Sequence, residues 1–151
     1  MRMNAENRLT PRLYGMTTPQ PDKHGVVALI QDEAGRYLFI RRGWALPRAP
    51  GMWCFVGGEV EQGESYASAI VREVREEVGL CVRAGEKFHE TISPNGEFRL
   101  HWLRVELTSD SPPLAPHPHE VAEVAWLTLE DALRLEPILP SLRVWLQAQV
   151  T

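Results

Sequence analysis

Residues 65–78 form the segment whose structure follows most directly from its residue pattern. Its apolar side chains recur at the i, i+3, i+4, i+7 and i+11 spacing of one helix face, as Ala67, Ile70, Val71, Val74 and Val78. Ser65 stands where an N-cap is needed, and Gly79 stands where a left-handed residue commonly ends a helix. An amphipathic helix is stable when its apolar face packs on another layer, so the chain must supply one.

The rest of the sequence supplies that layer as β-strands. Residues 24–31 contain the run VVALI, which predicts a strand buried on both faces. A turn at 32–35 then predicts a hairpin with its return strand at 37–41. We expect a short strand at 52–56 that Gly57-Gly58 ends, further strands at 80–83, 88–92, 97–107 and 121–127, and helices opening at 128–131 and covering 141–150. Strands mixed with few helices predict a layered α/β (α+β) domain.

Length and composition set the broad class of the protein. A chain of 151 residues suits one core, so we expect a flexible N-terminal arm at 1–20 and one domain at 21–151. The sequence has no signal-peptide pattern and no apolar run long enough to span a membrane. Cys54 and Cys81 lie among apolar neighbours and are expected to be buried free thiols, which suits a cytoplasmic location. A net charge of −4 argues against a nucleic acid polymer as partner.

Three glutamates, Glu73, Glu76 and Glu77, project together from the polar side of the predicted helix. Like charges at this spacing are unfavourable by roughly 0.2–0.5 kcal/mol per pair, and the helix dipole disfavours anions near Gly79. A divalent cation reverses that balance, and clustered carboxylates suit Mg²⁺, with Mn²⁺ as the alternative, better than Zn²⁺. The competing interpretation is a solvated acidic face in which arginines of the same helix pair with the glutamates.

The segment ahead of the helix favours the metal site. Gly57-Gly58 and Glu64 frame a tight loop, and the whole of residues 58–80 resembles the Nudix box, G-x5-E-x7-R-E-U-x-E-E-x-G-U with U aliphatic. Every specified position of that motif is present, as Gly58, Glu64, Arg72, Glu73, Val74, Glu76, Glu77, Gly79 and Leu80. The resemblance extends over about residues 24–135 and identifies the chain as similar to the Nudix hydrolases.

The resemblance implies a Nudix-type α/β/α sandwich with a mixed β-sheet. It also implies hydrolysis of a nucleoside diphosphate linked to another group. Glu73 matches a carboxylate that binds metal or acts as base, and Glu76 and Glu77 match metal ligands, with a carbonyl of Gly57 or Gly58 completing the set. Arg72 and Glu64 match residues that orient the carboxylates.

Other candidate residues lie outside the box. Glu120 is a candidate late metal ligand or base, with Glu123 as its competitor, and the His117-Pro-His119 segment is expected to be a loop rather than a metal site. Three arginines near the loop at 43–51 are candidates for phosphate binding, and two aromatics are candidates for substrate contact: Arg41, Arg42 and Arg48, with Trp44 for base stacking and Phe98. Trp53, Trp102 and Trp145 are expected in the core.

These patterns predict a Mg²⁺-dependent pyrophosphohydrolase that splits a nucleoside triphosphate into the monophosphate and pyrophosphate. An ADP-sugar or dinucleoside polyphosphate hydrolase is the alternative enzyme, and a non-catalytic nucleotide-binding module is the alternative of another class. The expected partner is a nucleotide-like small molecule, with no membrane contact, and a homodimer is left open.

Overall fold

A computed structural model of the chain describes residues 21–151, so the arm expected at 1–20 lies outside the described residues. The strands are β1 (Lys23–Ile30), β2 (Tyr37–Arg42), β3 (Trp53–Cys54), β4 (Val56–Glu59), β5 (Val82–Ile92), β6 (Phe98–Leu107) and β7 (Val121–Leu127). The helices are α1 (Tyr66–Val78), α2 (Leu129–Ala132) and α3 (Pro140–Val150). None of the helices in this described part is long and apolar enough to cross a membrane.

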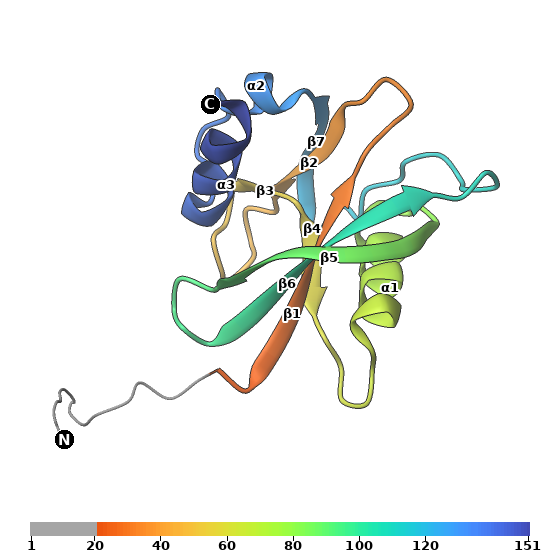
Figure 1. The fold of residues 1–151 in the computed structure, drawn as a ribbon, viewed down its shortest axis with the longest axis vertical. Helices are drawn as coiled ribbons and strands as arrows, with labels where there is room; N and C mark the ends of the chain where they lie inside the picture. The colour runs from red at the N-terminus through yellow and green to blue at the C-terminus, as the bar shows by residue number, and fades with distance from the viewer. Residues whose placement is uncertain (1–20) are drawn as a thin grey trace, which may run out of the picture.

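The strands form two sheets that lie together between the helices (Figure 1). The larger sheet has the order β4-β1-β6-β5 and is mixed, because β1 pairs in parallel with β6 while β4 and β5 pair antiparallel to their neighbours. The smaller sheet, β3-β2-β7, is antiparallel. The predicted hairpin of the first two strands is therefore wrong: β2 leaves β1 after the single bridge Gln31–Tyr37 and pairs with β7 instead.

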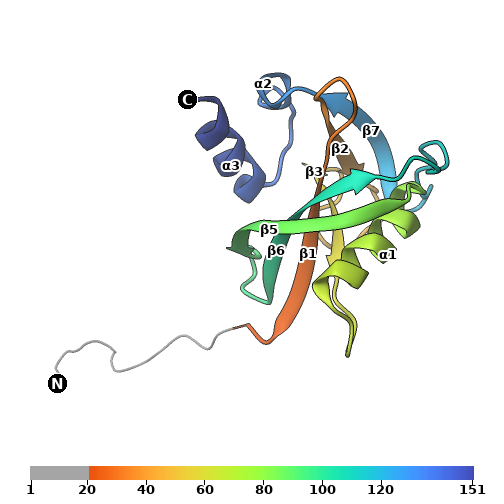
Figure 2. The same ribbon diagram turned by 45° about the vertical axis from the view of Figure 1, so that its right-hand side comes forward.

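Two apolar cores give the domain its layers. The first lies under α1, where Ile70, Val74 and Val78 pack on the strands, and the second lies under α3, which buries Leu142, Trp145 and Leu146. Figure 2 shows α1 and α3 on opposite sides of the strands. The α+β class and the mixed sheet are thus confirmed. The predicted core tryptophans are also confirmed, since Trp53, Trp102 and Trp145 all belong to the second core.

The ends of α1 follow the residues that the sequence analysis singled out. The Ser65 hydroxyl accepts a hydrogen bond from the Ser68 N–H at 3.0 Å, which caps the first turn. Gly79 has φ of 73°, the left-handed conformation that ends the helix, and its N–H donates to the Arg75 carbonyl. The carboxylate helix therefore has fixed limits at both ends.

Two strand predictions are wrong at their boundaries. The paired glycines do not end a strand, because Gly57 and Gly58 lie inside β4; a β-carbon on Gly57 would lie 2.3 Å from the Val26 carbonyl oxygen of β1. The segments 80–83 and 88–92 are one strand, β5, with register shifts between Ala84 and His89. Such bulges break the alternation of apolar and polar residues, so the sequence pattern divides the strand in two.

Candidate active site

Arg72 is the centre of the polar network around the carboxylate helix. Its Nε and Nη2 each donate to Glu64 at 2.8 Å, which is a two-point pairing, and its Nη2 also donates to the Glu59 carbonyl at 2.9 Å. Its Nη1 donates to Glu73 at 3.1 Å and to Glu76 at 3.2 Å. The pairing with Arg72 lowers the pKa of Glu64 to about 2, so Glu64 is a fixed negative charge that holds the guanidinium.

Glu73 lies against the backbone of β4. A β-carbon built on Gly58 would lie 2.2 Å from the Glu73 carboxyl carbon, so the missing side chain of Gly58 is what lets the carboxylate sit there. Burial raises the pKa of Glu73 to about 7, and Arg72 opposes the shift. A carboxyl group with this pKa suits either cation binding or proton transfer near neutral pH.

Glu77 is the more deeply buried carboxylate. Burial, followed by the charges of Glu73 and Glu120, raises its pKa to about 8, and a hydrogen bond from the Gly57 N–H opposes the shift. In an antiparallel ladder the N–H and C=O of one residue point to the same side. The Gly57 carbonyl therefore faces the side of Glu77, whereas the Gly58 carbonyl oxygen lies toward Gly25 of β1. Of the two predicted carbonyl ligands, Gly57 is the better placed.

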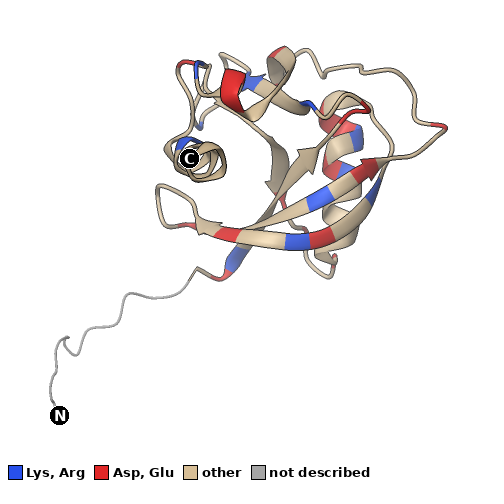
Figure 3. Cartoon of the chain, turned by 45° about the horizontal axis from the view of Figure 1, so that its top comes forward, with Lys and Arg blue, Asp and Glu red and all other residues tan. Residues whose placement is uncertain are grey.

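The donor set fits a hard divalent cation in its chemistry. It consists of carboxylate and carbonyl oxygens, and two of its carboxylates have pKa values raised by burial and mutual repulsion, which a cation would relieve. Figure 3 shows acidic and basic positions side by side on α1. Within residues 21–151 no three acidic, His or Cys side chains already converge in coordination geometry, and the Glu76 carboxylate is paired with Arg72.

The two late acidic residues have different surroundings. The charge of Glu120 acts on both Glu73 and Glu77, which places it beside the carboxylate cluster. Glu123 instead pairs with Arg41 at 3.4 Å across the β2–β7 ladder. His117 lies in the loop that leads to Glu120, and its Nδ1 accepts the N–H of His119 at 3.2 Å, which holds the turn there. The structure thus groups Glu120, and not Glu123, with the box.

The predicted phosphate-binding arginines lie in three different environments. The Arg42 Nε donates to the Arg48 carbonyl at 3.0 Å, and its charge acts on Glu77 of α1 and on Cys54 of β3, a residue that the sequence analysis did not connect with the site. Burial raises the pKa of the Cys54 thiol to about 12, so it stays neutral there. The thiol prediction holds for Cys54, which is buried and free, whereas Cys81 is free but only half-buried.

Arg41 and Trp44 form a stacked pair next to this region. The Arg41 guanidinium lies 4.6 Å from the Trp44 ring centroid, and its Nε donates to the Gly51 carbonyl at 2.8 Å. Trp44 is nevertheless 65% exposed. Gly51 is tightly packed on it, since a β-carbon there would lie 2.2 Å from the Trp44 ring. The result is a supported and exposed aromatic surface.

Arg48 and Phe98 form a separate contact. The Arg48 guanidinium lies 4.9 Å from the Phe98 ring centroid and pairs with Glu97 at 3.7 Å. Phe98 is only 4% exposed, so its ring is covered rather than open for stacking.

The loop at 43–51 is joined to the rest of the site at its first residue, where the Gly43 N–H donates to the Glu120 carbonyl at 2.9 Å.

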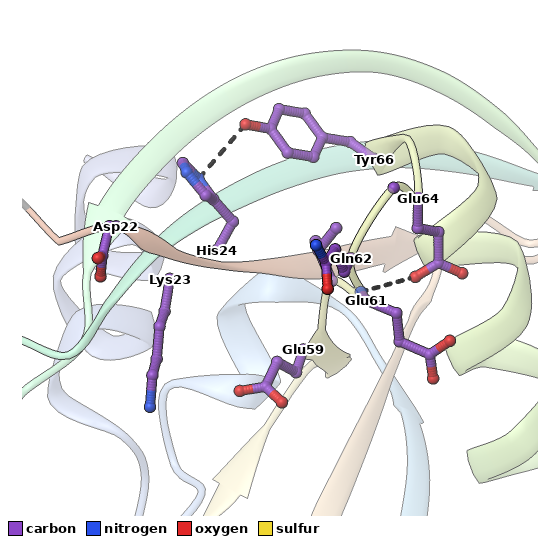
Figure 4. A pocket seen from close by; sticks show the side chains of 10 residues that line it. Asp22, Lys23, His24, Glu59, Glu61, Gln62, Glu64 and Tyr66 are labelled. Atoms are coloured by element: carbon purple, nitrogen blue, oxygen red, sulfur yellow. Dashed lines mark hydrogen bonds between the residues drawn. The ribbon is translucent and has the colours of Figure 1, made fainter.

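A cavity of about 530 Å³ lies beside the loop between β4 and α1 (Figure 4). His24 and Tyr66 line it together with Lys23 and acidic residues of the loop. Behind it, His101 of β6 is 3% exposed and contacts both His24 and Tyr66. The sequence analysis missed this histidine pair, whose members are far apart along the chain; a histidine inside an otherwise apolar strand was the available signal.

Comparisons with known proteins agree with this geometry. The NUDIX domain family matches residues 21–149. The chain is 34% identical over 118 residues to a CTP pyrophosphohydrolase from Escherichia coli, covering 77% of this chain and 83% of that protein. It is 30% identical over 103 residues to a putative 8-oxo-dGTP diphosphatase 2 from Mycobacterium tuberculosis, covering 66% and 70%.

A solved structure supports the same assignment. The MutT protein from Methanosarcina mazei Go1 superposes with a TM-score of 0.74 at 25% identity, covering 87% of this chain and 95% of that one. Nudix hydrolases generally use divalent metal ions, in keeping with the oxygen donors found here. The complete box at residues 58–80, the shared fold and the family match together show that this chain belongs to the Nudix hydrolase family and is a pyrophosphohydrolase.

Proposed function

We propose that the protein catalyses the Mg²⁺-dependent hydrolysis of a nucleoside triphosphate to the monophosphate and pyrophosphate. The observation that carries this proposal is the cluster of Glu73, Glu77 and Glu120, in which burial and repulsion raise the pKa of the first two carboxyl groups. Such a cluster is unfavourable in isolation and favourable around a divalent cation. A non-catalytic binding module would have no use for it.

The residues of the site would have three roles: binding the cation, orienting the carboxylates and accepting a proton. Glu73, Glu76, Glu77 and the Gly57 carbonyl would hold the cation, and Glu64 and Arg72 would orient the carboxylates. A bound Mg²⁺ would neutralise phosphate oxygens and make water a better nucleophile. Glu120 or Glu73 would accept the proton of the attacking water, since both lie in the cluster. The water oxygen adds to the α-phosphorus, and the bond from that phosphorus to the oxygen of the leaving pyrophosphate breaks.

The triphosphate is preferred over bulkier substrates because little of the chain is left for a second pocket. Residues 21–149 are taken up by the family fold. Pyrophosphate as the leaving group needs only charge neutralisation, which Arg42 can supply near Glu77 and Arg48 from the neighbouring loop. Two relatives are named for hydrolysis of nucleoside triphosphates, CTP and 8-oxo-dGTP. The cytoplasm is the proposed location, where free thiols such as Cys54 and Cys81 persist.

One assay tests the proposal. The purified protein is incubated with Mg²⁺ and a panel of CTP, dCTP, 8-oxo-dGTP, ATP, ADP-ribose and a dinucleoside polyphosphate, and the products are separated by anion-exchange chromatography. We expect the highest kcat/KM for a triphosphate, with pyrophosphate as product. A tenfold advantage of ADP-ribose or the dinucleotide would replace the triphosphate by the alternative enzyme class, and no turnover with any substrate would contradict the proposal.

A further inference from the structure

We propose that His24 is a positioning residue for the carboxylate helix: its side chain holds the first residue of α1 on the larger sheet. In this way it fixes the loop that carries Glu64. The inference rests on the proposed function, because it concerns the geometry of the proposed cation site. His24 lies outside the Nudix box, on the strand β1, and touches none of the proposed ligands in any contact found among residues 21–151.

His24 contacts both ends of the loop between β4 and α1. Its backbone carbonyl accepts the Val60 N–H at 2.9 Å, one residue after β4 ends. Its ring Nδ1 lies 3.3 Å from the hydroxyl of Tyr66, the first residue of α1. Figure 4 shows the Tyr66 hydroxyl directed at the His24 ring on one side of the cavity. The backbone contact is open to any residue, whereas the contact with Tyr66 needs this side chain.

A second imidazole supports the same tyrosine. The His24 Nδ1 lies 2.9 Å from the Nε2 of His101, and the Tyr66 ring stacks on the His101 ring at a centroid distance of 4.0 Å and an angle of 20°. β1 and β6 are parallel here, and His24 and His101 come from these two neighbouring strands. Tyr66 is therefore held by its hydroxyl from one strand and by its ring face from the next.

The histidine pair includes a buried polar atom that is unfavourable for the stability of the fold. His101 is 3% exposed, and its Nδ1 has no hydrogen-bond partner within residues 21–151; a carboxylate oxygen of Glu90 lies 3.8 Å away. Burying an unpaired ring nitrogen is unfavourable, and an apolar side chain would pack there at no such cost. A locally unfavourable polar group of this kind points to a function.

The positioning role of His24 follows from the presence of Glu64 in the loop between β4 and α1. Glu64 stands two residues before Tyr66 and makes the two-point pairing with Arg72, and its Oε1 also accepts the Glu61 N–H at 3.0 Å. Arg72 in turn contacts Glu73 and Glu76. A shift of the first turn of α1 relative to β1 would move Glu64, and with it the guanidinium that spaces the two carboxylates. His24 acts through Tyr66 and Glu64 and not on the substrate.

Two substitutions of His24 separate positioning from simple packing. An asparagine amide reaches the position of the ring Nδ1, which makes both side-chain contacts, whereas a glutamine amide reaches toward Nε2. The readout is the Kd for Mn²⁺ alone, measured by EPR well below the melting temperature, so it does not depend on turnover. Loss of a direct partner of a metal ligand costs about tenfold or more in affinity, and His24 acts further out, through Tyr66 and Glu64. We therefore expect His24→Gln to weaken Mn²⁺ binding about five- to tenfold and His24→Asn to stay within about twofold of wild type.

Tyr66→Phe is the second variant, and it removes only the hydroxyl. Because the ring stack on His101 remains, we expect a smaller weakening, roughly two- to tenfold. Gln62→Ala is the matched control, an exposed residue of the same loop that lines the same cavity, and it should bind Mn²⁺ like wild type. Should His24→Gln fail to fold, Tyr66→Phe against Gln62→Ala decides the matter.

Equal Mn²⁺ affinity in all variants would overturn the positioning role, and so would equal losses in His24→Asn and His24→Gln. A lower melting temperature with unchanged Mn²⁺ affinity would also overturn it and leave a purely structural pair. Failure of the wild-type protein to bind Mn²⁺ would contradict the proposed cation site and this inference together, whereas a failure in the nucleotide panel alone leaves the Mn²⁺ comparison intact.

Discussion

The Glu73 carboxylate lies directly on the α-carbon of Gly58, so that a β-carbon there would come within 2.2 Å of the carboxyl group. The helix and the edge strand of the sheet thus meet at a residue without a side chain. Any shift of Glu73 away from β4 would also take it from Arg72. The packing of α1 on β4 is therefore inseparable from the placing of the carboxylates.

Gly58→Ala should abolish most of the activity while the protein still folds. The added methyl group meets the end of a flexible side chain, so the glutamate moves and the strand does not have to. A misplaced catalytic group of this kind can cost about 100-fold in rate. Steady-state kcat and a thermal melt of the same sample check this. Full activity with normal stability would mean that Glu73 is not needed in its present position.

Glu77→Gln and Glu76→Gln should each lower kcat by orders of magnitude at saturating Mg²⁺, roughly 10²-fold or more if proton transfer is also affected. Both residues are proposed to bind the cation, and Gln keeps the size of the side chain. Circular dichroism should show the fold of each variant to be intact. Turnover close to that of the wild type in either one would remove that residue from the site.

Stability without metal should fall as the pH rises from about 4.5 to about 8. Burial raises the pKa of Glu77 in the folded protein from 4.5 to about 8, so in this range the folded state holds a proton that the unfolded state has released. The stabilising effect of the protonated form is complete below pH 4.5 and is lost as the pH passes through 8. Melts in chelator of the wild type and Glu77→Gln separate the two carboxyl groups. The variant should keep only the smaller fall that Glu73 gives, because the pKa of Glu73 is raised to about 7.

The sequence predicted the carboxylate helix well because its information is local. Helical periodicity, Ser65 and Gly79 fix α1, and the spacing of Glu73 and Glu77 fixes which face they share. The predicted apolar face is wrong at two positions, since Ala67 and Val71 are exposed and Ala69 is buried instead. The predicted hairpin and the strand end at Gly57 failed for the opposite reason. The pairing of strands depends on residues that are distant in sequence. Glycine is needed at position 57 within β4, because Val26 of β1 approaches it too closely for any side chain.

The histidine pair could not be predicted for the same reason, because its two members are distant in sequence. Nothing local relates His24 to His101; only the parallel pairing of β1 with β6 brings them together. Arg41 and Arg42, the last two residues of β2, were treated as one group, but the register of β2 against β7 shifts between them. The charge of Arg42 acts on Glu77, whereas the guanidinium of Arg41 lies over the Trp44 ring.

Glu120→Gln should slow the reaction more than Glu123→Gln. The charge of Glu120 acts on Glu73 and Glu77, whereas Glu123 is 55% exposed and pairs with Arg41. A surface ion pair of that kind contributes little to stability, so Glu123→Gln should leave kcat within about twofold of wild type. Rates of the two variants at saturating substrate make the comparison. Equal and negligible effects would exclude this region from the proton transfer.

Trp44→Ala should raise KM for every nucleoside triphosphate with little change in kcat. Its ring is exposed on a support formed by Arg41 and Gly51, and stacking of a base on an aromatic ring contributes roughly 1–3 kcal/mol whatever the base, so KM should rise about 5- to 150-fold. Trp44→Phe should recover most of the binding because it keeps a flat ring. Val144→Ala is the control, since Val144 is an exposed residue of α3 outside the proposed site. Initial rates with CTP and ATP decide the point: an unchanged KM in Trp44→Ala would show that the base binds elsewhere, and a fall in kcat alone would assign Trp44 to the catalytic step instead.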